Sequence, residues 1–199
     1  MKKIAVALMC MIMATGAAMA QKQFTFGPKI GVDYTHFWGK EVSHDGVLNY
    51  QAGLFMEYRF NDKMSIAPEV VFAAQGGKNK WVEFNGVETS TTYHLNYINV
   101  PVMLKFYVAP SLSIDLGPQL GINIYKKATD KWTIDGEDHK DTYELESPKS
   151  IDFGVGLGLT YNIAKDVFVQ GRYTMGMTKV FEHGEAKNGN AQIAIGYRF

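Results

Sequence analysis

The sequence has no cysteine in its main part, no net charge and no long apolar run after its first residues. Its only cysteine is Cys10, so residues 21–199 cannot form a disulfide. Lysine and arginine together number 20, as do aspartate and glutamate, and this zero net charge argues against a nucleic-acid partner. Beyond residue 20, no stretch approaches the roughly 20 consecutive apolar residues of a transmembrane helix. These absences exclude a disulfide scaffold and argue against a nucleic-acid-binding protein and a helical membrane protein.

Residues 1–20 have the pattern of a secretory signal peptide. Two lysines follow Met1, an apolar run covers residues 4–13, and Ala18-Met19-Ala20 ends the segment. The apolar run is too short to span a bilayer, and Leu8-Met9 before Cys10 do not fit a lipoprotein cleavage site. We therefore expect cleavage before Gln21, export of the chain, and a single domain over residues 21–199.

Residues 150–163 alternate strictly between large apolar and small or polar side chains. Alternation with a period of two indicates a β-strand whose faces meet different surroundings. One face has Asp152, three glycines, Thr160 and Asn162. The other face carries only bulky apolar residues, which are Ile151, Phe153, Val155, Leu157, Leu159, Tyr161 and Ile163. Bulky apolar groups opposite small polar ones are typical of a strand with lipid outside and a barrel lumen inside.

Seven further segments show the same two-faced pattern. They are residues 24–36, 48–60, 64–74, 93–108, 112–125, 167–178 and 190–199. In segment 93–108 the apolar phase changes near Tyr97-Ile98, so we expect a β-bulge there that joins the two phases. Four prolines, which are Pro28, Pro68, Pro101 and Pro118, fall inside these strands. Each of them removes one ladder hydrogen bond in a closed barrel.

The connections between these segments alternate in length. Residues 61–63, 109–111 and 164–166 form tight turns, and longer polar loops are expected over 37–47, 75–92, 126–149 and 179–189. Short turns on one side and long loops on the other are typical of bacterial outer-membrane barrels. We therefore predict an all-β fold, an eight-stranded antiparallel transmembrane up-and-down β-barrel. Its lumen is polar and glycine-rich, its short turns are periplasmic, and its long loops are extracellular.

A soluble barrel of the lipocalin kind is the alternative fold, with the apolar face turned inward around a ligand. Alternation by itself does not decide which face is inside. The polar face is too rich in glycine for a solvated exterior, and the chain ends on an aromatic residue in strand phase. Eight strands also leave too little interior for so many bulky groups. These features favour the membrane barrel.

The alternation places an equal number of acidic and basic residues inside the barrel. They are Lys29, Asp33, Glu57, Arg59, Glu69, Lys105, Asp115, Asp152, Arg172 and Arg198. Buried charges are costly unless they are paired, so we expect a network of ion pairs that fills the narrow lumen. A gated or narrow ion path through the same groups is the alternative.

Candidate catalytic and metal-binding residues fall in or beside the long loops. The histidines are His36, His44, His94, His139 and His183, and Ser43-His44 or His183 could serve a lipid hydrolase or acyltransferase. Nothing supplies a third catalytic residue, and 135–138 lacks the spacing of a calcium loop. We expect no enzyme, no cofactor and no metal site. Trp132 and Tyr143 make loop 126–149 the best candidate for contact with an outside partner.

The strand Tyr97-Ile98-Asn99-Val100-Pro101-Val102-Met103-Leu104-Lys105-Phe106-Tyr107 resembles a strand of the PorT-like outer-membrane β-barrel family of Bacteroidota. Gly117-Pro118-Gln119-Leu120-Gly121 is similar to another part of that family. The terminal segment, with Tyr197 and Phe199, resembles the signal that the barrel-assembly machinery recognises. The resemblance implies a Gram-negative outer-membrane barrel. The family's namesake serves gliding and type IX secretion, whereas most members have no assigned role.

We therefore expect a non-enzymatic outer-membrane barrel with a side-chain-filled lumen and a structural or surface-interaction role through its extracellular loops. An accessory of a type IX secretion or gliding machinery is one alternative, and an outer-leaflet lipid-modifying enzyme is another. The expected partners are outer-membrane lipid, including lipopolysaccharide, the barrel-assembly machinery, and a secretion-machinery or surface protein. No nucleic-acid partner is expected.

Overall fold

The computed structural model describes residues 23–39, 45–82, 88–134, 137–145, 150–181 and 185–199. The expected signal peptide lies outside these residues. All regular structure among them is β-strand. The nine strands are β1 (Phe24–Trp38), β2 (Val47–Asn61), β3 (Met64–Val82), β4 (Glu88–Ala109), β5 (Leu112–Ile134), β6 (Glu137–Glu144), β7 (Ile151–Asn162), β8 (Val167–Lys179) and β9 (Lys187–Tyr197). Within the described part of the chain, no helix is long and apolar enough to cross a bilayer.

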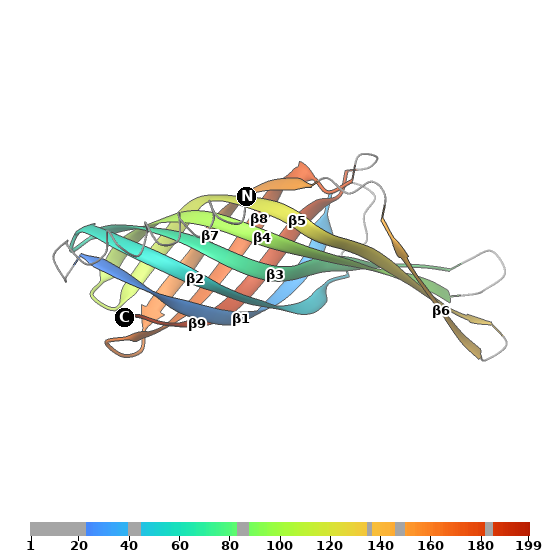
Figure 1. The fold of residues 1–199 in the computed structure, drawn as a ribbon, viewed down its shortest axis with the longest axis horizontal. Helices are drawn as coiled ribbons and strands as arrows, with labels where there is room; N and C mark the ends of the chain where they lie inside the picture. The colour runs from blue at the N-terminus through green and yellow to red at the C-terminus, as the bar shows by residue number, and fades with distance from the viewer. Residues whose placement is uncertain (1–22, 40–44, 83–87, 135–136, 146–149, 182–184) are drawn as a thin grey trace, which may run out of the picture.

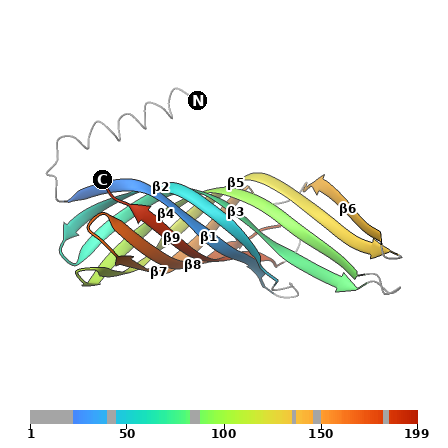
Figure 2. The same cartoon turned by 90° about the horizontal axis from the view of Figure 1, so that it is seen from below.

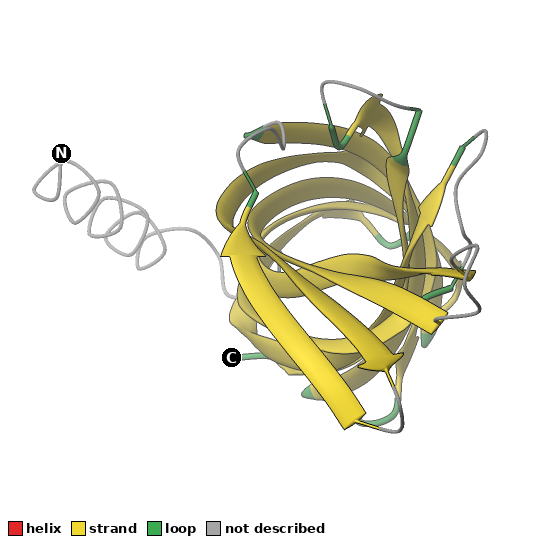
Figure 3. Cartoon of the chain, turned by 90° about the vertical axis from the view of Figure 1, so that its right-hand side faces the viewer, coloured by secondary structure: helices red, strands yellow, loops and turns green. Residues whose placement is uncertain are grey.

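Eight of these strands form a closed antiparallel ring. Each strand pairs with its neighbours in chain order, except that β5 pairs with β7 while β6 remains outside the ring. The ring closes where the first strand pairs with the last, for example at Ile30 opposite Ile195. Figure 3 shows the strands around a common axis, and Figure 1 shows their tilt. Closure leaves the ring without an unpaired edge, as a barrel in lipid requires.

The apolar face of every ring strand points away from the axis. Leu48 is 73% exposed, Ile193 is 62% exposed and Ile151 is 60% exposed. The alternate residues are mostly buried in the interior. Soluble monomers rarely expose so continuous an apolar surface, so this wall faces lipid and the lipocalin-like arrangement is excluded.

Each of the four strand prolines lies where the hydrogen-bond ladder to one of its two neighbouring strands is interrupted. The β2–β3 pairing omits Pro68, the β3–β4 pairing omits Pro101, and the β4–β5 pairing omits Pro118. The β1–β9 pairing begins one residue after Pro28. Each proline keeps its register with the strand on its other side. The missing N–H groups therefore coincide with gaps in the ladders, and the ring remains closed around them.

The prediction of a β-bulge in β4 at Tyr97-Ile98 is wrong. A register shift does occur opposite Asn96 and Tyr97, but the extra residue is Ile124 of β5. Strand β4 keeps a single phase, which turns Leu95 and Tyr97 inward, where they are 0% and 1% exposed. The change of apolar phase in the sequence therefore marks an apolar stretch of the interior.

Leu95 and Tyr97 belong to an apolar cluster at one end of the lumen. The cluster also contains Phe37, Val180 and Ala186, with Tyr93, Leu145 and Phe181 packed against it. The ring of Phe37 makes edge contacts with those of Tyr93 and Phe181 at 5.6 and 5.9 Å between centroids. We name this group the mouth cluster. Packing within it explains why β4 turns Leu95 and Tyr97 inward at this end of the lumen.

Two of the expected long loops are largely strand. Residues 75–82, 88–96, 125–134 and 137–144 form a four-stranded antiparallel sheet, which we name the projecting sheet. Its order is β3-β4-β5-β6, and it continues the barrel wall beyond the ring, as Figures 1 and 2 show. The sequence hid these strands because most of their side chains are polar, including buried ones such as Gln75, Thr91 and Thr129, so no apolar alternation marks them.

Gly117 allows a close approach of two backbones beside one ladder gap. A Cβ at this position would lie 2.0 Å from the carbonyl oxygen of Val102 and 2.9 Å from the Cα of Met103. Gly171 is its control, because a Cβ there would meet nothing within 4 Å.

Replacing Gly117 with alanine should destabilise the barrel by about 1–3 kcal/mol, because the clash is with backbone that has little freedom to move. Gly171→Ala should leave stability unchanged. Urea unfolding in detergent micelles, followed by the difference in gel mobility between boiled and unboiled protein, measures both variants. Equal stability of the two variants would contradict the close approach.

Candidate functional site in the lumen and projecting sheet

The ten charged residues expected in the lumen lie on the inward face of the ring strands. Eight are buried, which are Lys29, Asp33, Glu57, Glu69, Lys105, Asp115, Arg172 and Arg198. Asp152 is partly buried, and the side chain of Arg59 is 37% exposed at the turn end of β2. The structure therefore brings most of them into a single buried interior.

Glu69 is the acceptor for two cations near the middle of the lumen. Arg172 forms a two-pronged contact with it, with Nη2 2.5 Å from Oε1 and Nη1 3.1 Å from Oε2. Lys29 Nζ lies 2.6 Å from Oε2 and also donates to the side-chain oxygen of Gln170 at 2.9 Å. A bidentate arginine contact fixes orientation as well as charge, so this trio is the rigid centre of the interior.

Asp115 connects this trio to the rest of the network. It accepts hydrogen bonds from Ser113 at 2.6 Å, Thr160 at 2.5 Å and Gln170 at 3.1 Å. Lys105 Nζ lies 3.9 Å from its Oδ2. Gln170 thus bridges Asp115 and Lys29, and both carboxylate oxygens of Asp115 are satisfied, as a buried charge requires.

Glu57 gathers the cations nearest the turn end of the barrel. Lys105 lies 3.6 Å, Arg59 3.7 Å and Arg198 3.8 Å from its carboxylate. Ser65 donates to Glu57 at 2.8 Å, and the Tyr107 hydroxyl donates a further hydrogen bond. Lys105 is shared with Asp115, so eight of the ten charges belong to one connected network.

Asp33 and Asp152 lie apart from this network, towards the mouth cluster. Asp33 accepts from Gln51 at 2.8 Å, and Gln51 donates as well to Gln192 at 2.8 Å. Asp152 accepts from Asn188 at 2.8 Å and from Thr178. Neither has a cation within salt-bridge distance among the described residues, so amides and hydroxyls hold these two carboxylates.

The interior also contains aromatic residues that the sequence analysis did not assign to it. Phe55 and Phe168 meet edge to face at 5.0 Å between centroids. The guanidinium of Arg198 lies 4.5 Å above the Phe168 ring, and Lys105 Nζ lies 5.7 Å from the same ring. Both phenylalanines share strand phase with neighbouring polar inward residues, and this phase was the signal that could have found them. With the ion pairs and the mouth cluster, they fill the lumen with side chains.

The candidate catalytic and metal residues do not assemble. His36 stacks on Tyr173 at 6.2 Å, and His94 is exposed. His139 stacks on Trp132. Ser43, His44 and His183 lie outside the described residues, as do positions 135 and 136. Within the described chain, no group of histidine and carboxylate side chains could hold a metal ion.

The projecting sheet presents its outermost strand to solvent. All eight residues of β6 are exposed, and Tyr143 is 44% exposed. The rings of Trp132 and His139 lie nearly parallel, 5.7 Å apart with an angle of 15° between their planes. Strand β6 pairs over its whole length with residues 127–134 of β5, so its side chains are presented on a hydrogen-bonded frame.

The C-terminal aromatic residues lie on the outer surface of the ring. Tyr197 is 45% exposed and Phe199 is 67% exposed, with their rings 5.1 Å apart. The Phe199 amide donates to the carbonyl of Phe26 at 2.8 Å, which attaches the chain end to β1. Recognition of this segment by an assembly machinery stays a prediction.

A lipid-facing wall, a lumen filled by side chains and an extended outer sheet define a small transmembrane β-barrel. The chain belongs to the outer membrane protein beta-barrel domain family, whose model matches residues 19–182. It is therefore an outer-membrane barrel.

Solved structures show the same fold at low sequence identity. Ail, the attachment invasion locus protein of Yersinia pestis, is 15% identical, with 89% of this chain and 99% of that chain covered and a TM-score of 0.50. Neisserial surface protein A is 18% identical, with 87% and 97% covered and a TM-score of 0.53. No protein with a curated description matches the sequence. The structural likeness supports the fold alone.

Arg172→Ala should destabilise the barrel by about 1–3 kcal/mol, because it removes both hydrogen bonds that the guanidinium donates to the buried Glu69 carboxylate, which keeps only Lys29. Arg59→Ala removes the same kind of charge from a side chain that is 37% exposed, and it should cost less than about 1 kcal/mol. Denaturant unfolding of both variants in the same detergent measures the difference. An unchanged free energy of unfolding in Arg172→Ala would show that the centre of the lumen is solvated.

Proposed function

We propose that this protein is a non-enzymatic outer-membrane barrel that presents the projecting sheet to partners outside the cell. The observation that carries the proposal is the continuation of four hydrogen-bonded strands beyond the membrane wall, ending in the fully exposed strand β6. Rigid presentation of aromatic and charged groups lowers the entropy lost when a partner binds. That geometry supports a surface-interaction role.

The filled interior supports a role other than transport. The Glu69 and Glu57 clusters occupy the middle and the turn end of the lumen, and the mouth cluster occupies the other end. An ion path would require these packed and paired groups to separate. In this proposal the interior stabilises the barrel, and the outer surface carries the function.

The proposal includes the expected route to the membrane. Residues 1–20 act as a cleaved signal peptide, and Tyr197 and Phe199 contribute to recognition by the barrel-assembly machinery. The support is the sequence pattern of the first 20 residues and the exposed position of the two terminal aromatic side chains. Outer-leaflet lipid, including lipopolysaccharide, surrounds the wall.

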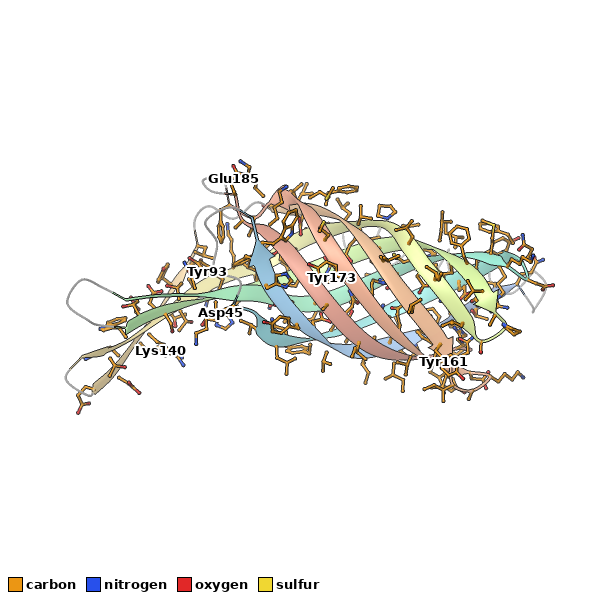
Figure 4. The ribbon with its side chains drawn as sticks, turned by 180° about the vertical axis from the view of Figure 1, so that it is seen from behind. Asp45, Tyr93, Lys140, Tyr161, Tyr173 and Glu185 are labelled. Carbon is orange, nitrogen blue, oxygen red and sulfur yellow. The ribbon has the colours of Figure 1, made fainter. Side chains whose placement is uncertain are left out.

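A photocrosslinking amino acid in place of Tyr143 tests the surface role. Its control replaces Tyr161 of β7, which is 53% exposed at the opposite end of the barrel from Lys140 of β6 (Figure 4). On intact cells, position 143 should yield protein or glycan adducts of discrete mass that position 161 does not form. Adducts that are the same at both positions would overturn the proposal.

A role as an accessory of type IX secretion or gliding is the second candidate. It is favoured by the resemblance of residues 97–107 and 117–121 to PorT-like barrels of Bacteroidota. An accessory would dock partners through its turns or through the projecting sheet.

Deleting the gene should leave the secreted and surface proteomes unchanged if the barrel acts only through its own surface. Quantitative comparison of both proteomes with and without the gene measures this, with the reintroduced gene as control. Loss of a whole class of exported proteins would instead establish the secretion role.

A further inference from the structure

The two faces of the projecting sheet differ in their chemistry. Successive side chains of a strand point to opposite faces, so the register assigns each residue of β5 and β6 to one of them. We name inner face the one that includes Tyr93 of β4, which packs against the mouth cluster. Its aromatic and acidic residues on β5 and β6 are Asp130, Trp132, Glu137, His139, Asp141 and Tyr143. The charged residues on the opposite face of these two strands are Lys127, Lys131, Asp138, Lys140 and Glu144.

The inner face has an excess of negative charge. Its three carboxylates share the face with one lysine of β5, Lys126, which is the register partner of Leu95 at the end of the sheet nearest the ring. On the opposite face, Lys131 and Lys140 are register partners of each other. The sheet therefore separates acidic from basic side chains, although the whole chain has no net charge.

Two of these carboxylates lie directly opposite each other. Asp130 and Asp141 are register partners on β5 and β6. Like charges in such a pair destabilise a sheet. Asp130 accepts a hydrogen bond from the Thr91 hydroxyl at 2.5 Å, and Asp141 accepts one from the amide of Thr142 at 2.8 Å. Among the described side chains, neither carboxylate has a cation within salt-bridge distance, so a cation from outside the protein would relieve their repulsion.

Aromatic rings lie on both sides of this acidic pair along the strands. On the side away from the ring, Trp132 and His139 are register partners whose rings lie 5.7 Å apart with an angle of 15° between their planes. On the side towards the ring are Tyr93 and Tyr143, and burial and the Asp130 carboxylate raise the pKa of both hydroxyls. Successive rows on one face of a sheet are about 7 Å apart. The carboxylates and the rings are therefore close enough for one ligand to contact both.

We propose that the inner face binds an arginine-containing basic segment of a protein outside the cell, with guanidinium groups paired to Asp130 and Asp141 and stacked on the neighbouring rings. A guanidinium offers planar donors to a carboxylate and also stacks on aromatic faces, so it uses both features of this surface. A neutral glycan would contact the same rings but would leave the two like charges uncompensated. This inference rests on the proposed surface role and names the chemistry of the partner.

The test compares two double variants that remove the same charge from opposite faces of the same two-stranded region. Asp130→Asn with Asp141→Asn alters the inner face, and Asp138→Asn with Glu144→Gln is the matched control on the opposite face. The probes are a fluorescent octapeptide of alternating arginine and serine and the same peptide with citrulline, an uncharged analogue, in place of arginine. Fluorescence anisotropy measures their binding to the purified barrel in mild detergent, and the gel mobility of unboiled protein verifies that each variant is folded.

The inner-face variant should bind the arginine peptide about tenfold more weakly than the wild type does, because it loses two exposed ion pairs of about threefold each. The control variant should bind this peptide within about twofold of the wild type, and the citrulline peptide should bind equally weakly to all three proteins. Equal affinity of the two variants for the arginine peptide would overturn the proposal, as would equal affinity of the wild type for the two peptides.

Two further measurements separate this inference from its alternatives. If the neutral oligosaccharide maltohexaose binds the wild type and the arginine peptide does not, the inner face is a glycan site and the proposal is overturned. Crosslinking at Tyr143 on intact cells reports on the surface role whatever the charge of the partner. Discrete adducts there, together with equal peptide binding by the two variants, would overturn this inference and leave the proposed function standing.

Discussion

The structure depends on one requirement: inside a lipid bilayer every backbone N–H and C=O must be paired within the protein. Pairing between β1 and β9 meets this requirement because it removes both free edges of the sheet. Once the ring is closed, successive side chains of each strand must point alternately to the lipid and to the lumen. Apolar residues cover the outside, and everything polar in those segments must be accommodated in the interior.

Ring closure buries charged side chains in the lumen, and ion pairs there compensate for their lost hydration. Charged groups inside a narrow barrel lose most of their hydration, so they must find partners within the same space. Glu69 between Lys29 and Arg172, and Glu57 among Lys105, Arg59 and Arg198, are such arrangements. Their side chains reach across the lumen, so the same contacts that balance charge also fill the volume.

The sequence predicted the lipid-facing wall well, since lipid imposes one rule on every exposed position. Residues 151–163 are the clearest case, because each alternate side chain obeys it. The confirmed fold class, the eight ring strands and their approximate bounds all follow from that rule. It also places the ten inward charges on one face, but their partners depend on distances between strands that are remote in sequence.

The alternation of apolar and polar side chains does not predict the structure of segments that have no contact with lipid. Residues 75–92 and 126–149 lie outside lipid and were expected to be loops, yet they pair along most of their length, because hydrogen bonding between strands does not require an apolar face. Leu95 and Tyr97 were placed on the wrong face, since an apolar residue was assumed to point to lipid. Phe55 and Phe168 show the same exception at the other end of the interior. The apolar contacts of a filled lumen are long-range, and local periodicity does not reveal them.

The prolines give the wall a mechanical property. Pro68 is the register partner of the residue that follows Pro101, and Pro101 is the partner of the residue that follows Pro118. Three adjacent strands therefore lack a cross-strand bond at nearly the same height, which forms an oblique crease across β3, β4 and β5. A sheet is most compliant to shear where its ladders are thinnest. The crease lies on the same three strands that continue into the projecting sheet, so we expect a lateral force on that sheet to bend the wall there first.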